Sequence, residues 1–482
     1  MNTTPTALDR LFACLLPAAG LLAGCVAPGP VVLDARTPSA WTQATPPLAA
    51  PPLAAPPVAA HAAAIPQAWW QVWNDGALNA LVDEALATNL DLGQAEHRLR
   101  QQRLLSGAAG QAYRPEFKGN IRTLQDVAAT DSYFHASIDM AWDLGLFGMA
   151  EAQSQVSAAD RLDAQARLQA VRVAIVADVV HRYLDIQMAR RQRQLLAQLA
   201  TLDQRGVQLA QVREQQRLGS SEATLQLRIQ AAQAQTQQIE LQQVQAQAAH
   251  GLAVLLGRDR PAPQWLAVDG TAPLPEVAAL PFAQLPADLL RTRPDIQQAE
   301  ALVVRAGGEA GLARSALYPR FVLQGSLLYS YNITGNHRVA SGSMPVFGPL
   351  IDIPLFDWGR RKAQADASQE GLQAASLAYR KAVVEAVAEA ESALAALTAQ
   401  QARHVLLAQV QELLQARAVA EGKRQQLGLA SEYSGLPAQR AALLNQSAQT
   451  TAQAAHALAY VALYKALGGA PVSALQEPED RP

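Results

Sequence analysis

The residue types that most often carry catalysis are scattered along this chain. Its eight histidines occur singly, and none belongs to an HExxH motif or to a pair with metal-ligand spacing. His181 and Asp185 are four residues apart, a spacing that a surface ion pair on a helix explains more simply than a site does. No glycine-rich phosphate-binding loop is present. The sequence therefore predicts a protein that is not an enzyme, takes no cofactor or metal and hydrolyses no nucleotide.

Cys25 is the residue whose surroundings do predict chemistry. The apolar run from Leu11 to Leu22 has the length of a secretory signal and is too short to span a membrane as a helix. It ends in LAGC, which resembles a bacterial lipobox. Cleavage after residue 24 would leave Cys25 as the first mature residue, carrying N-acyl (palmitate-type) and S-diacylglycerol groups. The alternative is an ordinary secretory signal with an incidental cysteine.

The rest of the N-terminal region fits a lipid anchor. Cys14 would leave with the signal peptide, so a mature chain could form no internal disulfide. Val26 takes the place of the aspartate that retains sorted lipoproteins at the inner membrane, which favours the outer membrane. The segment Pro46–Ala60 repeats a five-residue unit three times. Paired prolines favour an extended spacer of roughly 45 Å, with a protein-docking motif as the alternative.

Composition and charge narrow the class of protein. The net charge of −2 argues against a nucleic-acid partner. Aromatic residues make up only 5% of the chain, while alanine, glutamine and leucine dominate its later two thirds. This composition favours long helices that are packed through small side chains.

The chain contains an internal repeat. Residues 90–99 match 294–303 at an offset of 204, and Gly148 matches Gly359 at an offset of 211. Two copies of roughly 190 residues, joined by a proline-rich stretch, are expected. The predicted segments are a signal peptide (1–24), a lipidated N-terminus with spacer (25–66), repeat 1 (67–260), a linker (261–282), repeat 2 (283–470) and a C-terminal tail (471–482).

Each copy is expected to contain two strands. Residues 133–144 alternate, with apolar side chains from Phe134 to Leu144 on one face and polar ones on the other. Residues 320–331 follow the same pattern, and residues 116–127 follow it more weakly. In residues 343–356 three prolines interrupt the pattern, so only the second half is expected to be a strand. Such strands are typical of membrane barrels, although a half-buried soluble sheet alternates as well.

Very long helices favour the membrane interpretation. Seventy residues separate Gly148 from Gly219, and 68 separate Gly359 from Gly428. Each would form a helix of roughly 105 Å with coiled-coil periodicity, longer than a globular core requires. Four shorter helices, expected at 90–113, 221–256, 295–317 and 431–467, could stack end to end into one column beside each long helix.

Closure of the sheet requires other chains. Open strand edges are not tolerated in lipid, and bacterial barrels have at least about eight strands. Two or more subunits are therefore expected. Three subunits would give 12 strands and 12 helical columns by multiplication, although the pattern alone does not select three.

Two further motifs carry a family resemblance. Residues 285–303 (LPADLLRTRPDIQQAEALV) and 354–364 (PLFDWGRRKAQ), together with the lipobox, resemble TolC-like outer membrane efflux proteins of the NodT lipoprotein type. The resemblance implies a mainly α fold with transmembrane β: a homotrimeric 12-stranded β-barrel continued by a 12-helix periplasmic α-barrel. It also implies a passive exit duct that works with a periplasmic adaptor and an inner-membrane pump.

The candidate site residues follow from these elements. Gly148 and Gly359 lie where strands must bend into helices, and Pro294 suits the first turn of a helix. The resemblance places the periplasmic gate and the adaptor contact at the hairpin tips, around Leu218, Gly219 and Glu222 and around Leu427, Gly428 and Glu432. Ser221 and Ser431 are predicted N-caps of the returning helices.

The acidic residues at the tips have two interpretations. Family members often carry aspartates just past the second tip, where this chain has Ser434 and Pro437. We hypothesise that Glu222 and Glu432 form a weaker acidic ring. Alternatively, they are first-turn carboxylates that complement the helix dipole.

The sequence thus predicts an outer membrane channel, anchored by lipid and with most of its mass in the periplasm, for drugs or other small molecules. One alternative is a lipid-anchored periplasmic coiled-coil scaffold without a pore. Another is the exit duct of a type I protein secretion system.

Overall fold

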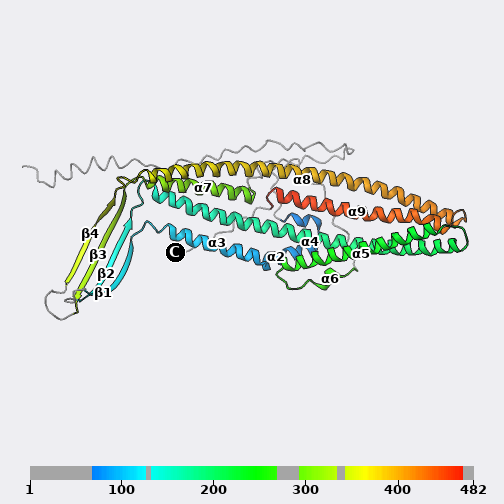
Figure 1. Cartoon of the computed structure of the whole chain (residues 1–482), viewed down its shortest axis with the longest axis horizontal. Helices are drawn as coiled ribbons and strands as arrows, with labels where there is room; N and C mark the ends of the chain where they lie inside the picture. Colours follow the sequence, from blue (N-terminus) through cyan, green and yellow to red (C-terminus); the bar gives the residue numbers. More distant parts are fainter. Residues whose placement is uncertain (1–67, 126–131, 269–291, 334–341, 470–482) are drawn as a thin grey trace, which may run out of the picture. The chain divides into compact units, whose positions relative to one another are not determined.

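The computed structural model describes residues 68–125, 132–268, 292–333 and 342–469 (Figure 1). Cys25, the proline-rich spacer and the C-terminal tail lie outside the described residues. The described residues form two compact units. The first contains residues 97–166 and 297–382, and the second contains residues 68–96, 167–296 and 383–469.

The first unit contains a four-stranded antiparallel sheet. Its strands are β1 (Glu116–Gln125), β2 (Ser132–Asp143), β3 (Arg320–Asn332) and β4 (Gly342–Asp352). They lie in the order β1-β2-β3-β4, side by side as Figure 1 shows. Among the described residues β1 and β4 therefore have one neighbouring strand each, so the sheet has two open edges.

The register of the sheet separates apolar from polar side chains. Phe134 lies opposite Tyr331, and Ile138 lies opposite Leu327. On the other face, Asp139 lies opposite Lys118 on one side and Ser326 on the other. Because side chains alternate along a strand, these pairs keep the two faces of β2 distinct. On β3 and β4 the Asp139 face also carries apolar residues: Val322, Leu328, Met344, Val346 and Leu350.

The polar face holds a hydrogen-bonded carboxylate. Asp139 accepts hydrogen bonds from Asn120 at 2.6 Å, from Ser137 at 3.0 Å and from Ser326 at 2.6 Å. These donors come from three adjacent strands. Polar residues on this face therefore partner one another, as they must if the face is to hold a fixed strand register.

The prediction for β4 was wrong. The strand runs from Gly342 to Asp352, with Pro345 and Pro349 inside it, and leaves out the last four residues of the expected segment 343–356. The prolines are tolerated because of their parity. Ile333 donates its N–H to the carbonyl of Ser132. The backbone N–H and C=O groups of odd-numbered residues of β3 therefore point towards β2, and those of even-numbered residues point towards β4. Even-numbered residues of β3 pair with even-numbered residues of β4, so these residues make the hydrogen bonds between the two strands. The backbone nitrogens of Pro345 and Pro349, which are odd-numbered, point towards the open edge, where no N–H is needed within the chain.

Helices of the first unit pack closely against one another. Here α7 (Pro294–Ser315) contacts the first turns of α4 (Met149–Gln215). A Cβ added at Gly308 would lie 2.7 Å from Cγ2 of Val156 and 2.8 Å from the carbonyl oxygen of Ala152. Gly308 is therefore the residue that allows the two backbones to approach.

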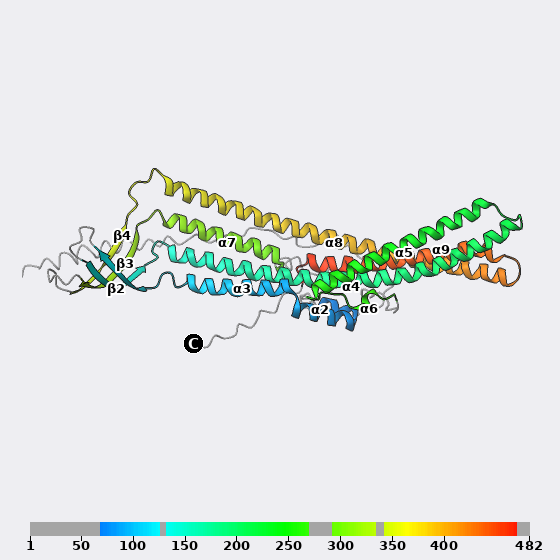
Figure 2. The same cartoon turned by 60° about the horizontal axis from the view of Figure 1, so that its bottom comes forward.

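Both long helices contain 67 residues: α4 and α8 (Arg360–Gln426). At about 1.5 Å per residue each is close to 100 Å long. In the second unit α5 (Ser221–Leu255) returns beside α4, and α9 (Glu432–Ala466) returns beside α8, as both views show (Figure 2). None of the described helices combines the length and apolar character needed to cross a bilayer.

Aromatic residues fix the start of the described chain to the second unit. The short 3-10 helix η1 (Trp69–Trp73) stacks Trp69 on Tyr464 of α9, with ring centroids 5.0 Å apart. Trp73 lies 5.8 Å from Tyr460. All three tryptophans of η1 are buried. The following helix, α2 (Gly76–Thr88), is capped by Asp75, which also accepts a hydrogen bond from Tyr183.

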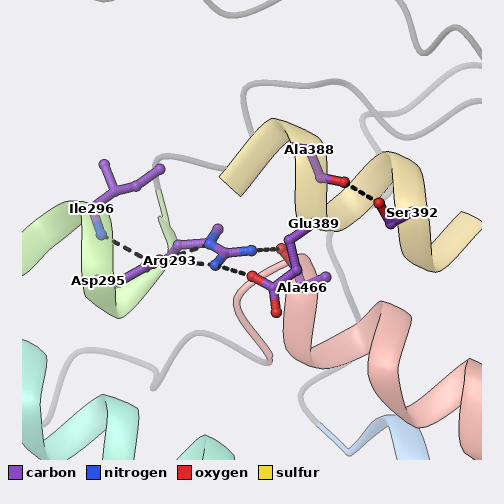
Figure 3. Close-up of polar contacts among 7 residues, drawn as sticks. All are labelled: Arg293, Asp295, Ile296, Ala388, Glu389, Ser392 and Ala466. Carbon is purple, nitrogen blue, oxygen red and sulfur yellow. Dashed lines mark hydrogen bonds and ion pairs between the residues drawn. The ribbon is translucent and has the colours of Figure 1, made fainter. Parts of the chain in front are cut away.

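Two polar junctions join the short helices end to end in the second unit. Asn89 caps the start of α3 (Leu90–Ala109) and donates to the carbonyl of Leu255, at the end of α5, at 2.8 Å. Arg293 precedes α7 and donates to the carbonyl of Ala466, at the end of α9 (Figure 3). The expected end-to-end contacts are therefore present. The expected end of α3 at Tyr113 was wrong, because turns occupy residues 110–114.

Arg293 is also the centre of an ion-pair cluster. Its guanidinium contacts Asp295 at 2.8 Å and Glu389 at 2.6 Å (Figure 3). Burial alone would raise the pKa of Asp295, but the hydrogen bonds and charge of Arg293 hold it below the usual value. Pro294 opens α7, as predicted, so its missing N–H costs no hydrogen bond.

Candidate functional site

The tip of the first hairpin is closed by a left-handed residue. After α4 ends at Gln215, Arg217 has a φ of 58°. Leu218 then donates its N–H to the carbonyl of Arg213 at 2.7 Å, and the Arg213 guanidinium donates to the carbonyl of Leu218. This geometry satisfies carbonyls that the helix end would otherwise leave unpaired.

The second tip repeats this geometry with a glycine. Gly428 has a φ of 72°, and Leu429 donates to the carbonyl of Arg424 at 2.8 Å. Arg217 and Gly428 are 211 positions apart, so the first tip has arginine where the second has glycine. The prediction that Gly219 ends the first helix was wrong, since the left-handed position is occupied by Arg217.

Serine residues cap both returning helices. Ser431 is the N-cap of α9 and accepts a hydrogen bond from Ser434 N, as predicted. The N-cap of α5 is Ser220, which accepts from Ala223 N, so the prediction of Ser221 was off by one residue. Glu222 and Glu432 both lie in first turns, where a negative charge complements the helix dipole.

Glu432 differs from Glu222 in having a cation beside it. Arg205 of α4 binds both carboxylate oxygens of Glu432, at 2.6 and 2.7 Å. This contact lowers the pKa of Glu432 and raises that of Arg205, mainly through the hydrogen bonds. The geometry therefore joins the two hairpins through a forked ion pair near their tips.

Two further contacts join the same hairpins. Arg440 of α9 donates to Asp203 of α4 at 3.0 Å, and Asp203 is only 2% exposed. The guanidinium of Arg213 lies over the ring of Tyr433, 4.9 Å from its centroid. Together with the Arg205–Glu432 pair, these three contacts are called the tip clamp below. A buried carboxylate such as Asp203 needs its partner, because an unpaired charge is costly there.

A groove of about 340 Å³ lies beside the tip clamp. Leu202, Gly206 and Leu227 line it from the first hairpin, and Leu436 lines it from the second. A Cβ at Gly206 would lie 3.4 Å from Cδ1 of Leu436. A Cβ at that distance would make an ordinary van der Waals contact, so the hairpins pack closely here without requiring a glycine.

The strand-to-helix bends form a second, separate group in the first unit. Gly148 and Gly359 have φ values of 79° and 80° and directly precede α4 and α8. The residues before them, Phe147 and Trp358, are also left-handed, with φ values of 55° and 54°. Each bend therefore contains two successive left-handed residues, although the sequence marks only the glycine.

The residues with catalytic potential are not gathered by the fold. Within the described ranges, no group of three His, Cys, Asp or Glu side chains could hold a metal ion. His181 and Asp185 form the expected pair at 3.5 Å, with Arg182 at 3.7 Å from the same carboxylate. His181 is half exposed, as a surface pair would be.

Sequence analysis missed most of the tip clamp. Arg205 and Glu432 are 227 positions apart, and Asp203 and Arg440 are 237 apart. The predicted antiparallel hairpins imply that such distant residues can meet. They do not show which side chain of one hairpin contacts which side chain of the other. A usable signal was the charged pair at 203 and 205 within an otherwise Ala-, Gln- and Leu-rich stretch.

Paired long hairpins and a sheet with segregated faces define a class of protein, the outer membrane channels with helical extensions. The solved structure of the outer-membrane channel OprN matches with a TM-score of 0.74 at 26% identity, covering 90% of this chain and 98% of that one. This chain is therefore mostly helical in the manner of TolC-like channels.

The family follows from the sequence comparisons. The outer membrane efflux protein family matches residues 81–258 and 285–469, and the chain belongs to this family. It is 29% identical to the toluene efflux pump outer membrane protein TtgC of Pseudomonas putida, over 84% of this chain and 86% of that protein. It is 28% identical to nodulation protein T of Rhizobium leguminosarum, over 68% and 69% respectively. The family consists of efflux channels rather than enzymes.

Proposed function

We propose that this chain is the outer membrane exit duct of a tripartite efflux system. Three copies would close a 12-stranded β-barrel from their four-stranded sheets and continue it as a 12-helix periplasmic α-barrel. The observation that carries the proposal is the sheet of the first unit, which has two open edges and, along β2, one apolar and one largely polar face. An open sheet of this kind needs neighbouring copies before it can face lipid.

The duct is passive and takes its energy from partners. An inner-membrane pump would drive drugs or other small molecules through a periplasmic adaptor into the duct. The names of relatives, such as a toluene efflux pump protein, support small molecules over secreted proteins as cargo. The two repeats, at 67–260 and 283–470, would each supply two strands and two helical columns.

A lipid anchor holds the N-terminus at the outer membrane. After cleavage of residues 1–24, Cys25 would carry the acyl groups, and residues 26–66 would form the tether to the helical body. Several acyl chains at about 0.8 kcal/mol per buried CH2 give a firm anchor. The segments 471–482 and 261–282 would be the C-terminal tail and the linker between the repeats.

The hairpin tips form the periplasmic gate and the adaptor contact. Leu218 and Leu427 are exposed there and would present apolar side chains to the adaptor. The tip clamp would hold the two hairpins of one subunit together in the closed state. An acidic ring from Glu222 and Glu432 would then be weaker than a ring of free carboxylates, because Arg205 partly neutralises Glu432.

Expression in a strain that lacks its own outer membrane efflux channel tests the proposal. The chain should restore resistance to small apolar drugs when its pump and adaptor are present, and outer membranes should contain a heat-modifiable trimer. A Cys25→Ala variant should lose acyl labelling. Purely soluble, monomeric behaviour after removal of the lipid would instead support a scaffold without a pore.

A further inference from the structure

The segment between β4 and α8 carries a group of exposed apolar side chains. Leu355 is 89% exposed, Phe356 75% and Trp358 87%. Trp358 also adopts a left-handed φ of 54°, which is unfavourable for a side chain of its size. Its ring contacts that of Phe356, with centroids 4.8 Å apart, but most of the indole remains free to contact something outside the described chain.

The other repeat shows what such a side chain contacts. Phe147 is 211 positions before Trp358 and has the same backbone conformation, with a φ of 55°. Its ring stacks on Tyr318 at 5.1 Å with an interplanar angle of 14°, and lies 6.3 Å from Phe321. Tyr318 lies two residues before β3, the strand next to β2, and Phe321 is the second residue of β3. The N–H of Leu144 also donates to the carbonyl of Phe321.

The equivalent partners of Trp358 lie at the start of β1. Positions 204 before Tyr318 and Phe321 are Arg114 and Phe117, and both are exposed. Within one chain β1 and β4 are the two opposite edges of the sheet, so Trp358 cannot reach them in the way that Phe147 reaches β3. A second copy that continues the sheet beyond β4 presents them in the required place.

We propose that Trp358 packs on Arg114 of the partner subunit and beside Phe117 of the partner subunit, forming an aromatic–guanidinium contact at every junction between copies. This inference rests on the proposed oligomeric duct and adds its joining contact. Arginine replaces tyrosine here because its planar guanidinium stacks on an indole face as an aromatic ring does. The N–H of Leu355 donates to the carbonyl of Phe117 of the partner subunit, as that of Leu144 does to Phe321.

The backbone of β4 explains why the junction needs a side-chain contact. Pro345 and Pro349 both face the open edge, and neither has an N–H to donate to a neighbouring strand. The junction between copies therefore lacks two donors that the β2–β3 pair has. Packing at the end of the strand compensates for part of this loss.

Cysteine cross-linking in outer membranes tests the contact. Arg114→Cys combined with Trp358→Cys, treated with a short bismaleimide, should give dimers and trimers on denaturing gels. Each single variant measures the background, including that of the native cysteines. The matched control, Phe147→Cys with Tyr318→Cys, should cross-link within one chain and remain at monomer mass.

The outcomes separate this inference from the proposed function. A heat-modifiable oligomer without the 114–358 cross-link would overturn the contact and leave the duct standing. Reaction of Trp358→Cys with a lipid-soluble maleimide in that oligomer would place residue 358 in lipid instead. A chain that is monomeric in outer membranes would overturn both.

Substitutions supply a second test that does not depend on cysteines. The temperature at which the oligomer dissociates should fall for Arg114→Lys, because an ammonium cannot stack as a planar guanidinium does, fall further for Arg114→Ala and fall most for Arg114→Glu. Arg114→Tyr with Trp358→Phe transplants the Tyr318–Phe147 pair and should restore the dissociation temperature that Arg114→Ala lowers. Equal dissociation temperatures in all these variants would exclude the contact.

Discussion

Asn89 and Arg293, 204 positions apart, occupy equivalent positions in the two repeats and make equivalent hydrogen bonds. Each is buried, each precedes a helix, and each donates a hydrogen bond to the last carbonyl of the helix that ends there, Leu255 or Ala466. Asparagine does this as a neutral cap, while arginine does it as the centre of an ion-pair cluster. The two repeats therefore satisfy the same helix-end carbonyl in different ways, with a neutral amide in one and a charged guanidinium in the other.

Removing Arg293 should destabilise the protein measurably. Arg293→Ala leaves Glu389 and Asp295 without their cation and the Ala466 carbonyl without its donor. We expect a loss of about 2–3 kcal/mol, the range for hydrogen bonds to charged groups. Thermal loss of the helical circular dichroism signal in detergent measures it. Arg305→Ala breaks half-exposed ion pairs with Asp160 and Glu309 and is the control, with an expected change below about 1 kcal/mol.

The hairpin tips should respond in opposite directions to glycine. Arg217→Gly relieves a left-handed arginine and should stabilise the first tip by roughly 1 kcal/mol. Gly428→Ala introduces the same strain at the second tip and should cost a similar amount. Hydrogen exchange of tip amides reports both changes. Equal protection in the two variants would show that the left-handed conformations are not maintained.

Replacing a glycine within a helix by alanine should stabilise the protein at one position and destabilise it at another. A Cβ at Gly371 of α8 meets no atom within 4 Å, so Gly371→Ala should stabilise the helix by about 1 kcal/mol. At Gly308 a Cβ would clash with α4, so Gly308→Ala should destabilise by roughly 1–3 kcal/mol despite the same gain in helix propensity. Thermal unfolding of the two variants side by side is the measurement. A stabilised Gly308→Ala protein would contradict the close approach of α7 to α4.

The tip clamp should make the channel sensitive to acid. Because its folded pKa is lowered, the Glu432 carboxylate contributes its full stabilisation above the ordinary value of 4.5 and loses it as the pH falls through the lowered pKa. Conductance in planar bilayers should therefore rise at low pH. Glu432→Gln should already be more conductive at neutral pH and should lack the part of the acid response that Glu432 causes.

Charge reversal provides the control for that prediction. Arg205→Glu should raise conductance at neutral pH, and the swap of Arg205→Glu with Glu432→Arg should return it towards the original value. A swap as conductive as the single variant would show that the ion pair does not hold the hairpins. Cation selectivity that is unchanged in Glu432→Gln would remove Glu432 from the proposed acidic ring.

Sequence patterns predicted the elements of this fold better than their ends. Two-residue and three-to-four-residue periodicities are local, so β2, β3 and both long helices were found nearly to the residue. The left-handed Arg217 was missed because arginine carries no turn signal, and Gly219 beside it does. The strand β4 was misplaced because prolines argue against a strand unless they lie on an open edge. The sequence pattern does not show that Pro345 and Pro349 do so.

The contacts of the candidate site were less predictable for a physical reason. Which face of α4 meets α9 depends on packing of many small residues, such as Gly206 beneath Leu436. A shift of one residue in that packing would give Asp203 and Arg205 other partners. Local patterns therefore located the hairpins but not the tip clamp that joins them.

The two prolines of β4 would also affect how a chain behaves before it assembles with other copies. An unassembled copy exposes two strand edges, and any extended segment of an unfolded neighbour could add to them. At β4 such an indiscriminate addition would forgo backbone hydrogen bonds at Pro345 and Pro349, whereas a correctly matched neighbour recovers stability through its side chains. In the proposed oligomer, the same residues that weaken the junction between copies would therefore protect unassembled chains from aggregation.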